Sequence, residues 1–78
     1  MTKQESWALM GERLRSIRFH AKINLETVAQ KLSLTKSQVS QWEHGRRPIP
    51  IYHLLELPEI LGCSLEDLNP KKEVSIKI

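Results

Sequence analysis

The chain has only one cysteine, Cys63, among its 78 residues. A single cysteine cannot form a disulfide within the chain, so a small scaffold held together by disulfides is excluded. The sequence has no apolar run near the roughly 18–20 residues of a membrane-spanning helix. Its polar first residues also lack the apolar core of a signal peptide. These absences predict a cytoplasmic protein with no membrane partner.

Metal-binding and catalytic motifs are missing as well. The three histidines, His20, His44 and His53, have no ligand spacing among themselves or with Cys63, and the sequence has no CxxC or HxxxH motif. It also has no glycine-rich phosphate loop and no sign of a nucleophile with its base. We therefore expect no metal, no cofactor, no small-molecule substrate and no enzymatic activity.

The excess of positive charge is small. Twelve Lys and Arg residues stand against nine Asp and Glu residues, which gives a net charge of +3. This balance permits a polyanionic partner without demanding one. The apolar and charged fractions, 40% and 27%, are ordinary for one globular domain. The interpretation of function must therefore depend on where the charged residues lie in the sequence.

Capping residues divide the chain into helical segments. Thr2 and Ser6 can each cap a first helix, and Glu5 follows Thr2 at the spacing of a capping box. Asn24 and Thr35 are good caps for the next two helices. The predicted helices cover roughly residues 5–21, 25–32, 36–43 and 51–61, followed by a short fifth helix from Ser64 to Asn69-Pro70.

Three residues mark special positions in these helices. Gly45 stands directly after the third helix, where glycine commonly ends a helix. Gly11 costs up to ~1 kcal/mol relative to alanine. Pro58 cannot donate a hydrogen bond to the carbonyl of Leu54, so we expect a kink or a break in the fourth helix.

The sequence thus predicts an all-α fold, a compact five-helix bundle in one domain of residues 1–70. The tail, residues 71–78, follows a different pattern, because Val74, Ile76 and Ile78 alternate with polar residues as in a β-strand. No other segment could pair with it, so a short strand here would pair with the tail of a second subunit. The alternative is a terminal segment without fixed structure.

Residues 25–44 carry the functional prediction. Two short helices are joined by about three residues, the small Ala29 stands where they cross, and apolar residues at 28, 32, 34, 39 and 42 hold the second helix at a fixed angle. This is a helix-turn-helix arrangement. The major groove of DNA is about 12 Å wide and admits one helix, so the helix at 36–43 is the predicted reading helix.

The sequence resembles the phage repressor and Cro family, also called XRE-type regulators, from about Met10 to Leu68. The matching residues are Asn24, Val28-Ala29, Leu32, Val39-Ser40-x-Trp42-Glu43-x-Gly45 and Leu61-Gly62-x-Ser64-x-x-x-Leu68. The resemblance implies five helices in a lambda-repressor-like fold, with the second and third helices as the reading unit. It also implies a homodimer on a palindromic operator.

Three residues depart from the family pattern. Leu25 stands where the family often has a glutamine that caps the second helix and holds a phosphate. Ser33 replaces the usual glycine of the turn, where φ is typically positive, so some strain is expected there. Pro58 replaces a small residue of the fourth helix.

The third helix has one face suited to reading bases. At about 100° per residue, Val39 and Trp42 define its buried side, and Ser37 and Gln41 point outward. The resemblance places the family's base-reading residues at Lys36, Ser37 and Gln41. Glutamine can pair with adenine, lysine with guanine and serine with either. The alternatives are a helix-start role for Ser37 and a solvated face for Gln41, but neither explains why the outward face has no acidic residue.

Contacts to DNA phosphates are expected around that helix. Arg46 and Arg47 lie in the loop after it, where the family meets the DNA backbone, although a solvated loop is the alternative. The other predicted phosphate-binding residues are Asn24, Lys36, Ser40 and His44. Arg18 and Glu43 match a buried ion pair found in parts of the family, which ties the first helix to the end of the third; the alternative is two unrelated surface charges.

Together these residues predict sequence-specific binding of double-stranded DNA by a transcriptional regulator, with a nucleoid-associated repressor as the leading interpretation. An antitoxin or the controller of a restriction system would use the same fold. A protein-interaction module that has lost DNA binding is a further alternative. Lys36, Gln41 and the pair Arg46-Arg47 argue against it, because an excess of acid on the third helix would be expected in such a module.

Overall fold

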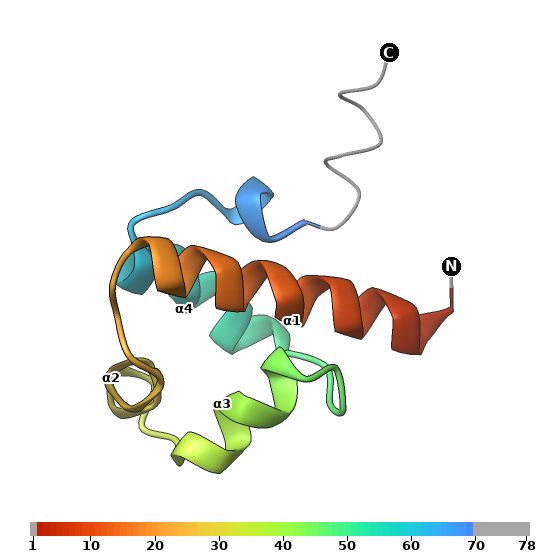
Figure 1. The fold of residues 1–78 in the computed structure, drawn as a ribbon, viewed down its shortest axis with the longest axis horizontal. Helices are drawn as coiled ribbons and strands as arrows, with labels where there is room; N and C mark the ends of the chain where they lie inside the picture. Colours follow the sequence, from red (N-terminus) through yellow and green to blue (C-terminus); the bar gives the residue numbers. More distant parts are fainter. Residues whose placement is uncertain (1, 70–78) are drawn as a thin grey trace.

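The computed structural model describes residues 2–69, which contain four α-helices and no strand (Figure 1). The helices are α1 (Lys3–His20), α2 (Leu25–Lys31), α3 (Lys36–Glu43) and α4 (Ile51–Leu61), followed by a short 3-10 helix, η1 (Leu65–Leu68). The long helix α1 crosses the molecule, with α2 and α3 on one side of it and η1 on the other. The all-α prediction is confirmed for this part of the chain.

Hydrogen bonds from capping side chains set the helix starts. The Thr2 hydroxyl accepts a hydrogen bond from the Glu5 N–H at 3.1 Å, and the Glu5 carboxylate accepts one from the Thr2 N–H at 2.7 Å. This capping box starts α1 at Lys3, earlier than predicted. The Asn24 side-chain oxygen caps α2 by accepting from the Thr27 N–H at 2.8 Å. Both signals were readable in the sequence because they are local.

The predicted fifth helix is only a 3-10 turn, so the five-helix count is not confirmed. The Ser64 N–H donates to the Asp67 carboxylate at 3.1 Å, as the capping spacing indicated. The turn ends at Leu68, and Asn69 is already extended, with φ −77° and ψ 118°. Pro70 follows in the sequence, and the residue before a proline avoids the helical region. Too few residues separate the cap from the proline for an α-helix.

The helix α4 continues through Pro58 to Leu61, so of the kink or break expected there, the break does not occur. An internal proline costs ~3 kcal/mol because it removes a backbone hydrogen bond and crowds the preceding turn. Leu57 and Leu61, which flank Pro58, are both buried in the core. Burial of each leucine contributes about 1.5–3 kcal/mol, which is enough to offset the proline.

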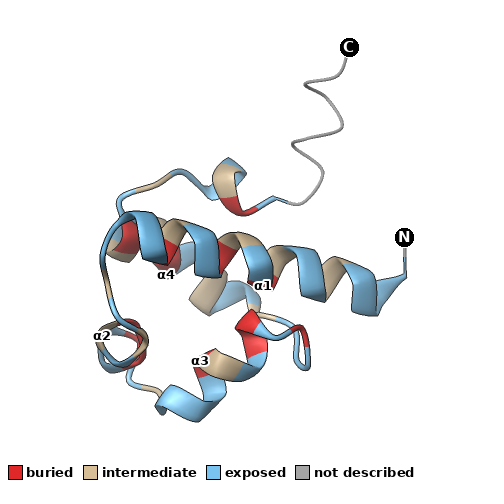
Figure 2. Ribbon diagram, viewed as in Figure 1, coloured by how far each residue is buried: buried red, intermediate tan, exposed pale blue. Residues whose placement is uncertain are grey.

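One hydrophobic core joins all the helices (Figure 2). Its largest fully buried side chains come from α1, α2, α3, α4 and η1. The buried apolar residues are Leu14, Val28, Ala29, Leu32, Val39, Trp42, Leu57, Leu61 and Leu68. Because each helix contributes to the same cluster, the position of α3 depends on the packing of all the others.

Two glycines let α1 pack directly against the end of α3. A Cβ atom on Gly11 would collide with the carbonyl oxygen of Trp42. A Cβ atom on Gly45 would lie 2.7 Å from the Cα of Ala8, and Gly45 also has a φ of +70°. Gly45 therefore ends α3 as predicted, and it serves this helix contact as well. The sequence showed only the helix-propensity cost of Gly11 and gave no sign of its contact.

No helix among residues 2–69 combines the length and the apolar character that crossing a membrane requires. The predicted tail strand, residues 71–78, lies outside the described residues, and so does Pro70 at the predicted end of the domain.

We predict that Gly11→Ala destabilises the fold, although alanine is the better helix former by ~1 kcal/mol. The added methyl group has no space beside the Trp42 carbonyl, and overpacking of this kind costs about 1–3 kcal/mol. Urea denaturation followed by circular dichroism measures the free energy of unfolding. Ser16→Ala, at an exposed position of the same helix, is the matched control and should be neutral or slightly stabilising. A Gly11→Ala protein as stable as this control would contradict the close packing.

Candidate nucleic-acid interface

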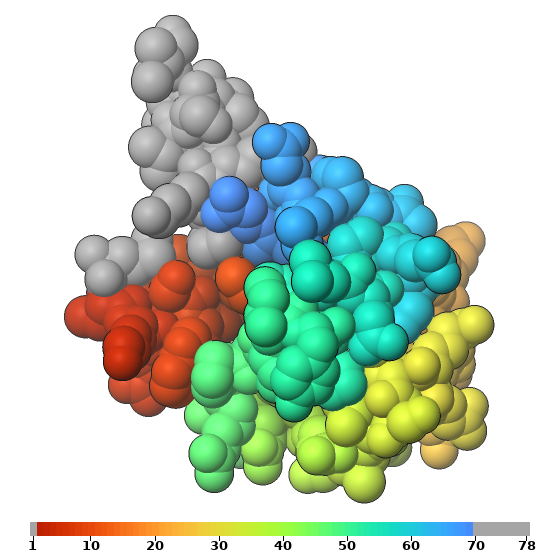
Figure 3. Space-filling view, turned by 180° about the vertical axis from the view of Figure 1, so that it is seen from behind, coloured from red at the N-terminus to blue at the C-terminus, as the bar shows by residue number. Residues whose placement is uncertain are grey.

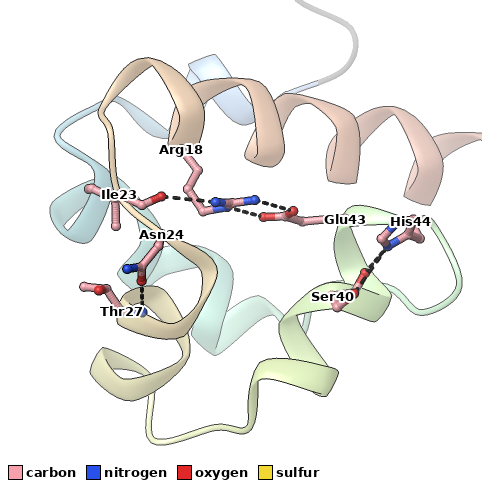
Figure 4. A network of polar contacts seen from close by, with 7 residues as sticks. All are labelled: Arg18, Ile23, Asn24, Thr27, Ser40, Glu43 and His44. Carbon is pink, nitrogen blue, oxygen red and sulfur yellow. Dashed lines mark hydrogen bonds and ion pairs between the residues drawn. The ribbon is translucent and has the colours of Figure 1, made fainter.

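A buried ion pair between α1 and α3 fixes the geometry of the candidate interface (Figure 4). The Arg18 Nε donates to Glu43 Oε2 at 2.7 Å, and Nη2 donates to Oε1 at 3.0 Å. The remaining nitrogen, Nη1, donates to the carbonyl oxygen of Ile23 at 3.1 Å. One guanidinium thus joins α1, the end of α3 and the segment that leads into α2. The hydrogen bonds that Arg18 donates to the Glu43 carboxylate raise the pKa of Arg18, against the opposing effect of burial.

The turn between α2 and α3 has the geometry of a helix-turn-helix unit. Ser33 has a φ of +60°, the left-handed conformation expected for the turn. The Leu34 N–H donates to the Ala29 carbonyl at 2.8 Å, which closes the turn. Ala29 and Val39 are buried where the two helices meet. The orientation of α3 therefore follows from a short connection whose N–H groups at Ser33 and Leu34 bond back to α2.

The outward face of α3 consists of polar and basic side chains. Lys36, Ser37 and Gln41 are exposed, whereas Val39 and Trp42 are buried. No intramolecular side-chain hydrogen bond involves Lys36, Ser37 or Gln41 within residues 2–69. These three predicted base readers keep their donors and acceptors available. Gln38 differs, because its side chain accepts a hydrogen bond from the Thr35 N–H at 2.9 Å and is engaged in capping α3.

The only acidic residue of α3 is turned away from this face. Glu43 is buried against Arg18, so its negative charge does not reach the surface that Lys36 and Gln41 share. The same ion pair therefore fixes the helix and removes an acid that would repel a polyanion.

The predicted phosphate-binding residues do not form one cluster. Asn24 lies at the start of α2, while Ser40 and His44 lie at the end of α3, on the other side of the ion pair (Figure 4). The Asn24 oxygen is used to cap α2, which leaves its amide NH₂ as the outward donor. The His44 Nδ1 lies 2.8 Å from the Ser40 carbonyl, and the ring is exposed. These residues can contact a DNA backbone only at separate points.

The loop after α3 brings Arg47 beside the outward face of α3. Arg46 and Arg47 are both exposed. Arg47 lines a hollow of about 460 Å³ with Gln41 and Tyr52, so a predicted base reader and a predicted phosphate contact share one depression. Tyr52, on the first turn of α4, was not among the predicted site residues. No local pattern relates positions 41 and 52, and only the fold brings them together.

The hollow has an aromatic wall. The Tyr52 ring lies 4.5 Å from that of His53, and His53 lies 5.7 Å from Trp42. The His53 Nδ1 is 3.1 Å from a carboxylate oxygen of Glu56. These contacts attach the first turn of α4 to the buried side of α3. Among residues 2–69, no three potential metal-ligating side chains come together.

A family model for helix-turn-helix domains matches residues 14–68. The chain belongs to the helix-turn-helix family. The match begins at Leu14 and ends at Leu68, two of the most deeply buried residues, and it includes the turn at Ser33 and all of α2, α3 and α4. The helix-turn-helix prediction from residues 25–44 is thereby confirmed. No curated protein sequence matches the chain.

Three solved helix-turn-helix structures are similar to the chain. The restriction-modification controller protein C.AhdI from Aeromonas hydrophila has 26% identity and a TM-score of 0.80, over 87% of this chain and 99% of that one. The clp gene regulator ClgR from C. glutamicum has 26% identity and a TM-score of 0.74, over 80% of each chain. The BldD DNA-binding domain from S. venezulae has 28% identity and a TM-score of 0.73, over 85% of this chain and 99% of that one.

We predict that Glu43→Ala lowers the free energy of unfolding of this helix-turn-helix protein by about 3–5 kcal/mol, because it leaves the buried Arg18 charge without its partner. The double substitution Arg18→Met with Glu43→Leu should lower the free energy of unfolding by less, since it leaves no unpaired charge. Thermal and urea denaturation measure the free energy of unfolding of both variants. Glu12→Ala removes an exposed carboxylate from α1 and serves as the control. If Glu43→Ala loses no more free energy of unfolding than Glu12→Ala does, the ion pair contributes little to stability.

Proposed function

We propose that the protein is a transcriptional regulator that binds double-stranded DNA and reads the major groove with α3. The observation that carries the proposal is the outward face of α3, where Lys36, Ser37 and Gln41 are exposed and the one acid of the helix is buried. Glutamine, lysine and serine are side chains that recognise base edges in the major groove. This combination suits a polyanion whose bases present donors and acceptors.

In this proposal the flanking residues hold the DNA backbone. Arg46 and Arg47 supply charge in the loop after α3, while Asn24, Ser40 and His44 supply hydrogen-bonding groups at the two ends of the unit. Lys36 can serve both purposes because it stands at the first turn of α3. Phosphate contacts of this kind set the position of the protein, and base contacts set its sequence preference.

We further propose that two copies bind a palindromic operator and repress transcription. Helix-turn-helix dimers place their reading helices about 34–36 Å apart, one turn of DNA, so each copy reads one half-site. A single α3 of eight residues touches only a few base pairs, and a second copy doubles the length of sequence that is read.

The controller of a restriction system is the second candidate. It is supported by the similarity to C.AhdI, which extends over 99% of that chain with a TM-score of 0.80. The physical function, reading DNA with α3, is the same in both proposals. A protein-interaction module is disfavoured because the exposed part of α3 has no acidic residue.

The proposal predicts DNA binding that weakens steeply with salt. Each neutralised phosphate contributes roughly −0.9 to the slope of log K against log salt concentration, so several backbone contacts give a slope of several units. Fluorescence anisotropy with a labelled duplex, measured between about 50 and 200 mM salt, tests this directly. A binding constant that does not change over that range would contradict the proposal.

Substitutions should separate residues that read bases from residues that hold phosphates. A cognate site is first selected from a random pool of duplexes. Gln41→Ala should then lose about 1–3 kcal/mol of binding free energy at that site, while its binding to random DNA stays nearly unchanged. Arg46→Ala should weaken all sequences alike and reduce the salt slope by about one unit. Gln4→Ala, at an exposed position of α1, is the control. If each variant loses the same binding free energy on cognate and on random DNA, the division into base-reading and phosphate-binding residues is refuted.

A further inference from the structure

The outer side of α1 has an aromatic side chain that no described element covers. Phe19 is 58% exposed. It follows Met10 by nine residues, which places the two on opposite sides of the helix at roughly 100° per residue. Met10 lines a hollow together with Leu54 of α4 and Leu68 of η1, so Phe19 points away from those two elements. Figure 3 shows α4 in the middle of one face of the molecule, with the C-terminal end of α1 behind it.

Two guanidinium groups lie over the Phe19 ring. The central carbon of the Arg15 guanidinium is 5.3 Å from the ring centroid, and that of Arg18 is 4.9 Å from it. Arg18 is itself held by its hydrogen bonds to Glu43 and to the Ile23 carbonyl. The ring therefore rests against a fixed group, and an aromatic ring that is already ordered loses little conformational entropy when a partner binds it.

A hollow lies beside the ring. It has a volume of about 260 Å³ and is lined by Glu12, Arg15, Ser16, Phe19 and His20. The first four of these residues have the spacing i, i+3, i+4 and i+7, which places them on one stripe of α1. We call this stripe, together with the hollow, the Phe19 surface.

The Phe19 surface has an excess of positive charge. Arg15 makes no ion pair with any other residue of the range 2–69. Lys22 is exposed in the turn that ends α1, where its N–H donates to the Phe19 carbonyl at 3.0 Å. Glu12 is the one acidic residue of the lining. Two exposed cations thus stand near one aromatic ring and one carboxylate, and a partner that complements them must have negative charge.

We infer that the Phe19 surface binds an acidic segment of another protein, in which a large apolar side chain is flanked by carboxylates. The apolar side chain enters the hollow against the Phe19 ring, and the carboxylates pair with Arg15 and Lys22. Aromatic residues and arginine are enriched at the centres of protein interfaces. A DNA backbone is the poorer fit, because it has no apolar group for the ring and because Glu12 repels phosphate.

This inference does not depend on the proposed DNA reading. The Phe19 surface uses none of the exposed residues of α3, and α1 faces α3 through a different stripe, which contains Gly11 and Arg18. A partner at Phe19 would nevertheless cover the ring that contacts Arg18. It would therefore bind beside the guanidinium that holds the end of α3.

Selection of a phage-displayed library of random peptides on the immobilised full chain tests the inference. The enriched peptides should have Asp or Glu next to a large apolar residue. A synthetic copy of the most enriched peptide should bind the wild type in fluorescence polarisation. Phe19→Ala should weaken this binding at least about tenfold, and so should Arg15→Glu, because it reverses the charge that pairs with a carboxylate.

Tyr52→Ala is the matched control. Tyr52 is an aromatic residue that is 64% exposed on α4, outside the Phe19 surface, so its removal should leave the affinity for the peptide unchanged. Circular dichroism establishes that each variant is folded.

The inference would be overturned by a selection that enriches no peptide, by enriched peptides without acidic residues, or by a peptide that binds Phe19→Ala and Arg15→Glu as tightly as the wild type. DNA binding of the same variants tests the other class of partner. If Phe19→Ala weakens binding to the selected duplex as much as Arg46→Ala does, the surface belongs to the DNA interface and the inference is also wrong. A wild type that binds the acidic peptide but no DNA would refute DNA reading and support the Phe19 surface.

Discussion

The ion pair between Arg18 and Glu43 is the interaction on which the rest of the structure depends. Through it, the single side chain of Arg18 joins α1 to the entry to α2 and to the end of α3. Desolvation of two charges is costly, and their attraction offsets it only when the geometry is good and further hydrogen bonds are made. The two-point contact and the bond to the Ile23 carbonyl meet both conditions. The pair therefore joins α1 to the end of α3 at a defined geometry.

Backbone contacts beside the ion pair restrict α3 further. Gly11 and Gly45 allow α1 to touch the last turn of α3 directly, so a change in the angle of α3 would collide with α1. Trp42 is buried in the core, and its ring lies 5.7 Å from the ring of His53 on α4, at an angle of 39°. A helix of only eight residues would be marginal by itself. Here its direction is set by a charge pair, a close backbone approach and an aromatic contact.

Local signals in the sequence predicted most of the secondary structure, and long-range contacts account for most of what it missed. Asn24, Thr35 and Gly45 placed the ends of α2 and α3 correctly because caps act within a few residues. The helical period separated Val39 and Trp42 from the exposed residues of α3. The contact of Gly11 with Trp42, and that of Tyr52 with the hollow beside Gln41, depend on the packing of distant segments, which no local pattern encodes. The predicted short fifth helix is a 3-10 turn, because Pro70 follows its cap closely in the sequence. A break at Pro58 was expected from the proline alone, whereas α4 continues through it with Leu57 and Leu61 buried in the core.

The exposed residues of α3 have a consequence for how such a protein can diverge. Lys36, Ser37 and Gln41 neither pack in the core nor bond to other side chains of the described chain, whereas Gln38, Val39, Trp42 and Glu43 do. Replacing the first group should therefore leave the stability of the fold almost unchanged, while replacing the second group should lower it. In the proposed function, folding and target choice would depend on different residues of the same two helical turns. Under that proposal, substitutions at these three exposed positions would change the DNA sequence that is read while the core that holds α3 stays intact.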